Sequence, residues 1–116
     1  MYKIIFYHYK NGYEPVNAYI EELSARKDKD SRIKCNKIRE CIRVLQEHGT
    51  RAGEPYMKHL NGEIWELRPL RDRILFAAWV GDAFVLLHHF VKKTQKTPQR
   101  EIDKAKRELE DFIRRN

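Results

Sequence analysis

Cysteine, glycine, proline and long apolar runs are all scarce in this chain of 116 residues. The two cysteines, Cys35 and Cys41, lie in a segment with helical periodicity, where their spacing places them about 240° apart around the helix axis. They cannot reach each other for a disulfide, and buried free thiols are typical of a reducing cytoplasm. No apolar run approaches the roughly 18 residues that a transmembrane helix needs, and the N-terminal segment is too short and polar for a signal peptide. We therefore expect a cytoplasmic protein that does not bind a membrane.

The motifs that indicate several enzyme classes are missing as well. The chain has no glycine-rich phosphate loop of the nucleotide hydrolases, no GxSxG motif and no glycine-rich dinucleotide turn. Its Cys, His and carboxylate residues do not show the spacing of a zinc or calcium site, and His88 and His89 are adjacent in a predicted strand, so they face opposite ways. We expect no metal and no other cofactor.

Acidic residues are absent between Ala83 and Arg100, although that segment contains Lys92, Lys93 and Lys96. Over the whole chain 24 Lys and Arg outnumber 17 Asp and Glu, which gives a net charge of +7. Such an excess favours an anionic partner, either nucleic acid, an acidic protein or a membrane surface. The alternative is that the extra cations only keep a small protein soluble.

The apolar segments predict one α+β domain that covers residues 1–116. Hydrophobic residues make up 41% of the chain, enough for a core without help from a metal or a disulfide. Aromatic and β-branched residues predict a strand near the N-terminus, and helical periodicity predicts two amphipathic helices after it. Four further apolar segments are separated by gaps of hairpin length, so their strands must pair antiparallel. Pro98, with Thr97 as N-cap, predicts the start of a last helix.

The predicted order is therefore β-α-α-β-β-β-β-α. We expect an antiparallel-rich sheet with the two N-terminal helices packed on one face, and a C-terminal helix. The predicted elements are a strand at 2–9, helices at 15–25 and 31–48, strands at 56–60, 63–69, 72–80 and 83–91, and a helix from 98 onward.

The predicted sheet brings arginines of neighbouring strands together. Alternate side chains of a strand share one face, so Arg68 is expected on the open face of its strand, opposite Trp65 and Leu67. The same alternation directs Arg71 and Arg73 to the open, solvent-facing side of the next strand. Adjacent arginines repel each other unless an acid pairs with them, and Glu66, on the same face as Arg68, offsets only one of them. A bridging phosphate would satisfy both arginines bidentately. The sequence therefore predicts a phosphate-binding site here.

Lysines from two other segments complete this predicted site. Lys92 and Lys93 follow the most apolar strand, and Lys92 is the better candidate because it shares a face with His88 and Phe90, although a β-bulge would exchange the two lysines. Lys58, on the first strand of the hairpin, is a further candidate. The alternative is that cations at strand ends only protect sheet edges from aggregation.

Two segments of this chain, GEIWELRPLRDRILFAAW and FVLLHHFVKKTQKTPQREIDKAKRELEDF, closely resemble the HigB-like, phage-associated toxins of the RelE/ParE superfamily. The likeness spans nearly the whole chain and implies a RelE-like fold and the toxin of a bacterial type II toxin–antitoxin system. Such toxins are mostly endoribonucleases, or mRNA interferases, that enter the ribosomal A site and cut mRNA there. The implied partners are the ribosome, mRNA and a HigA-like helix-turn-helix antitoxin, with operator DNA contacted only through the antitoxin complex.

The resemblance implies a reaction in which the RNA 2′-hydroxyl attacks the adjacent phosphate without a metal. Arg68 and Arg73 would stabilise the negative charge of the phosphorane. A lysine crowded by other cations has a lowered pKa, so Lys92 or Lys93 would accept or donate the proton. The expected RNA-binding residues clamp flanking phosphates, stack on a base or contact the substrate as an acid or base: Lys58, Lys96, Tyr56, Phe90 and His88.

Several alternatives remain open at this point. His88 is at least as well explained as a core histidine, and no residue is an obvious general base, although Glu54 and His59 are candidates. A ParE-type inhibitor of DNA gyrase would share the fold and cleave nothing. A plain rRNA- or DNA-binding module without catalysis is a third hypothesis. The lysines after the last strand favour RNA, because a protein partner would not require so many unpaired cations.

Overall fold

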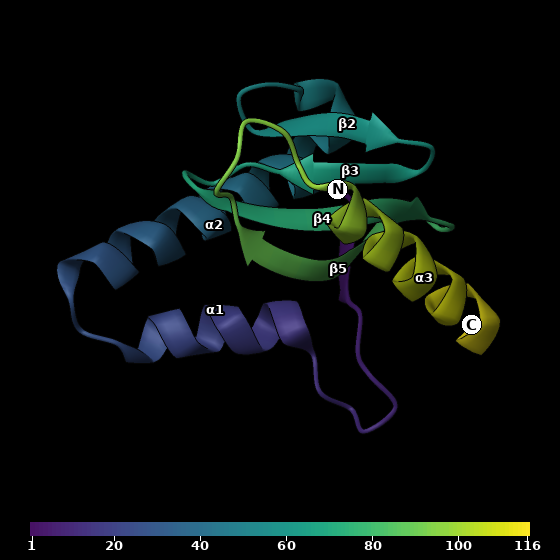
Figure 1. Ribbon diagram of the computed structural model, residues 1–116, viewed down its shortest axis with the longest axis horizontal. Coiled ribbons are helices and arrows are strands. Elements are labelled where there is room, and N and C mark those ends of the chain that lie inside the picture. Colours follow the sequence, from purple (N-terminus) through teal and green to yellow (C-terminus); the bar gives the residue numbers. More distant parts are fainter.

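The computed structural model describes all 116 residues and has the α+β architecture that the sequence predicts, a five-stranded sheet between two layers of helix (Figure 1). The order of strands and helices is the predicted one, with a short 3₁₀ helix added. The elements are β1 (Lys3–Phe6), α1 (Pro15–Ala25), α2 (Lys29–His48), η1 (Gly49–Ala52), β2 (Met57–Asn61), β3 (Ile64–Leu67), β4 (Asp72–Trp79), β5 (Ala83–Val91) and α3 (Gln99–Arg115).

The helix starts follow from local capping. Pro15 occupies the first turn of α1, as predicted. α2 begins two residues earlier than predicted, because the carboxylate of Asp28 accepts a hydrogen bond from the backbone amide of Ser31 at 3.0 Å and caps the helix. The prediction for α3 is wrong by one residue: Pro98 is the N-cap, and Thr97 makes no capping bond. None of the three helices is long and apolar enough to cross a membrane.

The strands lie in the order β1-β5-β4-β3-β2. The pairs β2–β3, β3–β4 and β4–β5 are antiparallel, as the hairpin-length connections require, whereas β1 pairs with β5 in parallel. The turn between β2 and β3 consists of Gly62 and Glu63, and Gly62 has a φ of 55°, a conformation that favours glycine. In Figure 1 the loop that joins β5 to α3 arches over the sheet beside β2 and β3.

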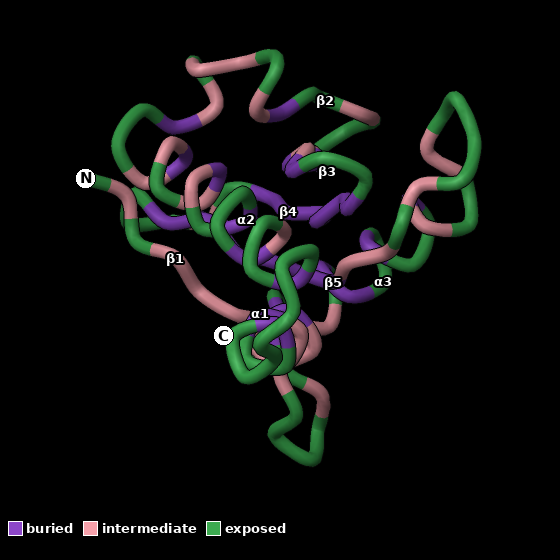
Figure 2. Tube along the Cα trace, turned by 90° about the vertical axis from the view of Figure 1, so that its left-hand side faces the viewer, coloured by how far each residue is buried: buried purple, intermediate pink, exposed green.

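Each face of the sheet has its own apolar core. The α1–α2 face buries residues such as Ile38, Leu45 and Phe76, and both cysteines are buried there as free thiols. The α3 face buries Leu87 and Phe112 among others. Figure 2 shows the buried residues concentrated along β3, β4 and β5. Because both faces are covered, the strand ends are where polar side chains reach solvent.

A β-bulge in β5 sets which side chains face α3. Leu75 of β4 pairs with His88, while the next residue, Phe76, pairs with Leu86, so Leu87 is the extra residue. Beyond the bulge the alternation resumes, and Phe90 pairs with Arg73. His88 and His89 face opposite sides of the sheet, as their adjacency predicts.

Candidate functional site

Cations from separate segments of the chain meet at one end of the sheet, on the side of α3. A cavity of about 310 Å³ is lined, among others, by the cations Lys58, Arg68, Lys92 and Lys96. A neighbouring cavity of about 450 Å³ contains the cations Arg71, Arg73, Lys92 and Lys93. Lys92 lines both cavities, so they form one basic surface, which we call the cation site.

Strand register explains why these residues meet. Lys58 of β2 pairs with Glu66 of β3, Glu66 pairs with Leu75 of β4, and Leu75 pairs with His88 of β5. These residues therefore form one row across the sheet. Arg73 lies two residues before Leu75 and on the same face, nearer the strand end. The period of two along these strands thus places a cation or its partner on this face in β2, β3 and β4, and Lys92 just after β5.

Glu66 is the one carboxylate that lines the cation site, and it is buried. Its Oε2 atom lies 3.4 Å from Nε of Arg68 and 3.8 Å from Nε of Arg73. Its Oε1 atom accepts a hydrogen bond of 2.5 Å from the Thr97 hydroxyl. One negative charge therefore holds two guanidinium groups and the loop before α3, and leaves the site with a net positive charge.

Arg73 is held more firmly than the sequence predicts. It is only 6% exposed, and its Nη1 atom donates hydrogen bonds to the carbonyls of Leu70 and Asp72, both at 2.8 Å. Burial lowers the pKa of its guanidinium. The expectation of a solvent-facing Arg73 is wrong, because its backbone partners hold the side chain against the strand end with part of it lining the cavity.

Arg68 and Glu54 form an ion pair at the rim of the site. Nη1 of Arg68 donates to Oε1 of Glu54 at 3.0 Å, and the Glu54 side chain is 65% exposed. This carboxylate therefore serves first as a partner of Arg68. His59, the other candidate base, lines the smaller cavity and has its Nε2 atom 2.8 Å from the carbonyl of Gly62.

The two lysines after β5 differ in their surroundings. Lys92 is half-buried, and burial lowers the pKa of its ammonium, as do the nearby charges of Arg73 and Arg68. Lys93 is exposed and also lines a third cavity, of about 410 Å³, with Phe90 and Arg100. Lys92 thus lies with the arginines, on the side that the strand alternation favours, and Lys93 lies at the outer margin.

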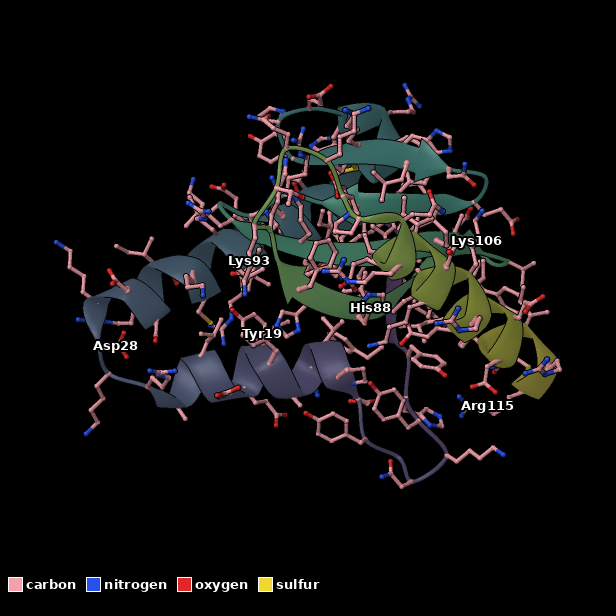
Figure 3. The ribbon with its side chains drawn as sticks, in the orientation of Figure 1. Tyr19, Asp28, His88, Lys93, Lys106 and Arg115 are labelled. Carbon is pink, nitrogen blue, oxygen red and sulfur yellow. The ribbon has the colours of Figure 1, made fainter.

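His88 does not lie where RNA can contact it. The residue is 2% exposed, with Nδ1 at 2.5 Å from Oε1 of Glu108 and Nε2 at 3.0 Å from Oε1 of Glu101. Both carboxylates belong to α3, so His88 connects the sheet to that helix (Figure 3). The alternative of a core histidine describes it better, with side-chain carboxylates in place of backbone partners.

The two aromatic candidates for base stacking lie in different places. Phe90 is half-buried beside Lys93, on the α3 side of β5. Tyr56 lines a separate cavity of about 510 Å³ with Tyr2 and Arg51, and its side chain packs against the α1–α2 core. Tyr56 therefore does not share the cation site, and the expectation that it stacks on an RNA base there does not hold.

Thr97 is a site residue that the sequence did not indicate. Its position before Pro98 favours a helix cap, whereas its hydroxyl bonds Glu66, 31 positions earlier in the chain. No local pattern signals such a contact. No group of three or more His, Cys, Asp and Glu side chains in the structure could hold a metal ion.

Comparison with known families gives a match over most of the chain. Residues 19–110 match the model of a family described as phage-derived protein Gp49-like (DUF891). The matched region runs from α1 into α3 and includes every cation of the cation site. No curated protein matches the chain.

The contacts of Arg73 predict a cost in stability when the residue is removed. Arg73→Ala leaves the carbonyls of Leu70 and Asp72 and the carboxylate of Glu66 without this partner, so the free energy of unfolding should fall by about 2 to 3 kcal/mol. Urea denaturation followed by circular dichroism measures this. Arg71→Ala, at the exposed neighbour, is the matched control and should change it by less than about 0.5 kcal/mol. Equal stability of the two variants would contradict the contacts described above.

Proposed function

This chain belongs to the family of phage-derived Gp49-like proteins (DUF891), and on that premise we propose that it is a ribosome-dependent endoribonuclease that arrests growth by cutting mRNA. The family belongs to the RelE/ParE-like toxin superfamily, and its members are generally toxin-like proteins of toxin–antitoxin systems. The order of strands and helices is compatible with a RelE-like fold. Membership thus gives the class of protein, and the cation site supports the chemistry.

The observation that carries the nuclease proposal is the sharing of Glu66 by Arg68 and Arg73, with Lys92 beside them. The two guanidinium groups and the ammonium of Lys92 carry three positive charges, which exceed the charge of the carboxylates of Glu66 and, at the rim, Glu54. A phosphodiester carries the complementary charge and can accept hydrogen bonds from both arginines. Exposed cations on either side, Lys58 and Lys96 on one and Lys93 on the other, suit the neighbouring phosphates of a single strand.

The proposed reaction uses a nucleophile that the RNA supplies. The 2′-hydroxyl oxygen bonds to the adjacent phosphorus and loses its proton, and the bond from phosphorus to the 5′-oxygen of the next nucleotide breaks. The products are a 2′,3′-cyclic phosphate and a 5′-hydroxyl. Arg68 and Arg73 stabilise the charge of the pentacoordinate phosphorane as groups already in place before the reaction. Phe90, beside Lys93, offers a surface on which a flanking base can stack.

Lys92 is the residue to which we assign proton transfer to the leaving 5′-oxygen. Its ammonium releases a proton more readily than an ordinary lysine, because burial and the charges of Arg73 and Arg68 lower its pKa. Lys93 is exposed and lies farther out, so it binds phosphate in this scheme. The proton of the 2′-hydroxyl goes to a base at the rim of the site, for which Glu54 and His59 are the two candidates.

The family implies an antitoxin partner. We propose that this antitoxin is a HigA-like helix-turn-helix protein, that the toxin acts on mRNA in the ribosomal A site of the cytoplasm, and that it reaches operator DNA only through the antitoxin complex. The excess of basic residues suits both the RNA and an acidic surface of the antitoxin.

Induction of the protein in bacteria should create new 5′-hydroxyl ends inside coding sequences, because cleavage by the 2′-hydroxyl leaves that end. Sequencing of ligated 5′-hydroxyl ends, before and after induction, detects them in register with codons. Arg68→Ala, which retains Glu66 and Arg73, should lower their yield by about 10²-fold or more. Intact mRNA together with altered plasmid supercoiling would contradict the nuclease and favour a gyrase inhibitor.

Proton donation by Lys92 predicts a pH dependence with a definite sign. The ammonium can donate only below its lowered pKa, so single-turnover cleavage on purified ribosomes should fall as the pH rises into the alkaline range. Lys92→Arg keeps the positive charge and RNA binding but cannot release its proton, so the rate should drop about 10²-fold and its alkaline decline should disappear. Lys93→Arg is the matched control and should keep both rate and profile. An unchanged rate in Lys92→Arg would assign the donor to another group.

A further inference from the structure

A second cluster of polar side chains lies behind the cation site, on the face of the sheet that α1 and α2 cover. At its centre is Asp72, the first residue of β4, which is fully buried. Its Oδ1 atom accepts a hydrogen bond of 2.9 Å from the hydroxyl of Tyr19 on α1. Nζ of Lys34 on α2 lies 3.8 Å from its Oδ2 atom. One carboxylate at the end of β4 is thus contacted by both helices.

The Tyr19 ring is fixed as well as its hydroxyl. It stacks on His89 of β5 with ring centroids 3.6 Å apart and an angle of 12° between the planes. Figure 3 shows Tyr19 projecting from α1 toward β5. Because β5 pairs with β4, the ring and the hydroxyl of Tyr19 contact two neighbouring strands at the same end. This is the end at which the cations gather on the opposite face.

Burial of Asp72 requires an explanation beyond packing. A buried carboxylate is costly unless its oxygens are well paired, and Oδ2 of Asp72 has no hydrogen-bond partner. An apolar side chain would fill the same space at a lower cost in free energy. The hydroxyl of Tyr19 is protonated at neutral pH, as that of any tyrosine is, and burial raises its pKa further, so it acts as a donor to Asp72. The cluster is therefore poorly explained as a contribution to stability alone.

The backbone of Asp72 connects this cluster to the cation site. Its carbonyl accepts the hydrogen bond from Nη1 of Arg73, and its amide donates to the carbonyl of Pro69 at 3.1 Å. The carbonyl of Arg71 accepts from the backbone amide of Lys92 at 2.8 Å. The turn of residues 69–72 thus holds both Arg73 and Lys92.

The same turn contains a strained residue. Leu70 has a φ of 58°, in the left-handed region, and its carbonyl is the second acceptor for Arg73. A leucine keeps such a conformation only where surrounding contacts fix the backbone. The side chain of Asp72, held from the other face of the sheet, supplies such a contact at the end of the turn.

We propose that Asp72 is a positioning residue, held by Tyr19 and Lys34, which fixes the turn of residues 69–72 and so places the guanidinium of Arg73 for the RNA phosphate. The inference rests on the proposed function in one respect, that Arg73 binds RNA. It adds that the α1–α2 pair controls the site from the opposite face of the sheet, although neither helix contributes a side chain to the cation site.

The test uses Tyr19→Phe, which removes the hydroxyl and keeps the ring that stacks on His89. The probe is a short RNA oligonucleotide with 2′-O-methyl groups, which cannot be cleaved, and its affinity is measured by fluorescence anisotropy. Tyr19→Phe should weaken binding about three- to tenfold, because Arg73 loses its fixed position. It should also shift the Nε–H signal of Arg73 in ¹⁵N NMR spectra. Tyr13→Phe, at a tyrosine that is 52% exposed and whose hydroxyl bonds no residue, is the matched control.

A double variant separates positioning from a general loss of stability. If Tyr19 acts through Arg73, then adding Tyr19→Phe to Arg73→Lys should weaken RNA binding no further than Arg73→Lys alone. Additive effects, or wild-type affinity and an unchanged Arg73 signal in Tyr19→Phe, would overturn the proposal. Should Tyr19→Phe fail to fold, Lys34→Met tests the same link from α2, with the same expected results.

A result that overturns the proposed function differs from a result that overturns the positioning role of Asp72. If Arg73→Lys binds the oligonucleotide as well as the wild type does, then Arg73 is not an RNA ligand and the nuclease scheme loses its main residue. The NMR measurement still decides the positioning in that case. A shifted Arg73 signal in Tyr19→Phe supports it, and an unchanged signal rejects it.

Discussion

One buried carboxylate between two arginines is the interaction on which the cation site depends. Without Glu66, the guanidinium groups of Arg68 and Arg73 would repel each other at the end of the sheet; with it, both are held and positive charge remains in excess. The hydroxyl of Thr97 binds the same carboxylate and fixes the loop that carries the lysines. An anion that enters the site meets groups that are already in place, and little reorganisation is needed to stabilise charge.

The fold supplies this arrangement from both faces of one sheet. Strand register places Lys58 and Glu66 in one row, and beyond the β5 bulge the alternation resumes and places Phe90 across from Arg73. On the α3 side, His88 contacts the carboxylates of Glu101 and Glu108 and so holds the helix that follows the loop against the sheet. On the other side, Tyr19 and Lys34 hold Asp72, whose carbonyl binds Arg73. The proposed nuclease site is therefore a strand-end surface stabilised by contacts in both helical layers.

The sequence was sufficient for features that depend on local periodicity. Hairpin-length gaps predicted the antiparallel pairing, and the period of two placed Arg68 and Arg73 on one face of the sheet. It was insufficient where a contact joins distant positions. The burial of Arg73 depends on backbone carbonyls in a turn that contains the left-handed Leu70. The environment of His88 depends on carboxylates of α3, and the role of Thr97 depends on Glu66 in β3. No residue pattern near these positions specifies their partners, because the partners are set by how the layers pack.

The central claim is that Arg68 and Arg73 jointly bind one backbone phosphate. The most direct test is a crystal structure of the protein with a short RNA whose 2′-O-methyl groups prevent cleavage. The account predicts one phosphate with its non-bridging oxygens within hydrogen-bond distance of both guanidinium groups, and the next 5′-oxygen beside Nζ of Lys92. RNA bound elsewhere, for example along the exposed basic face of α2, with Glu66 still the sole partner shared by the two arginines, would contradict it.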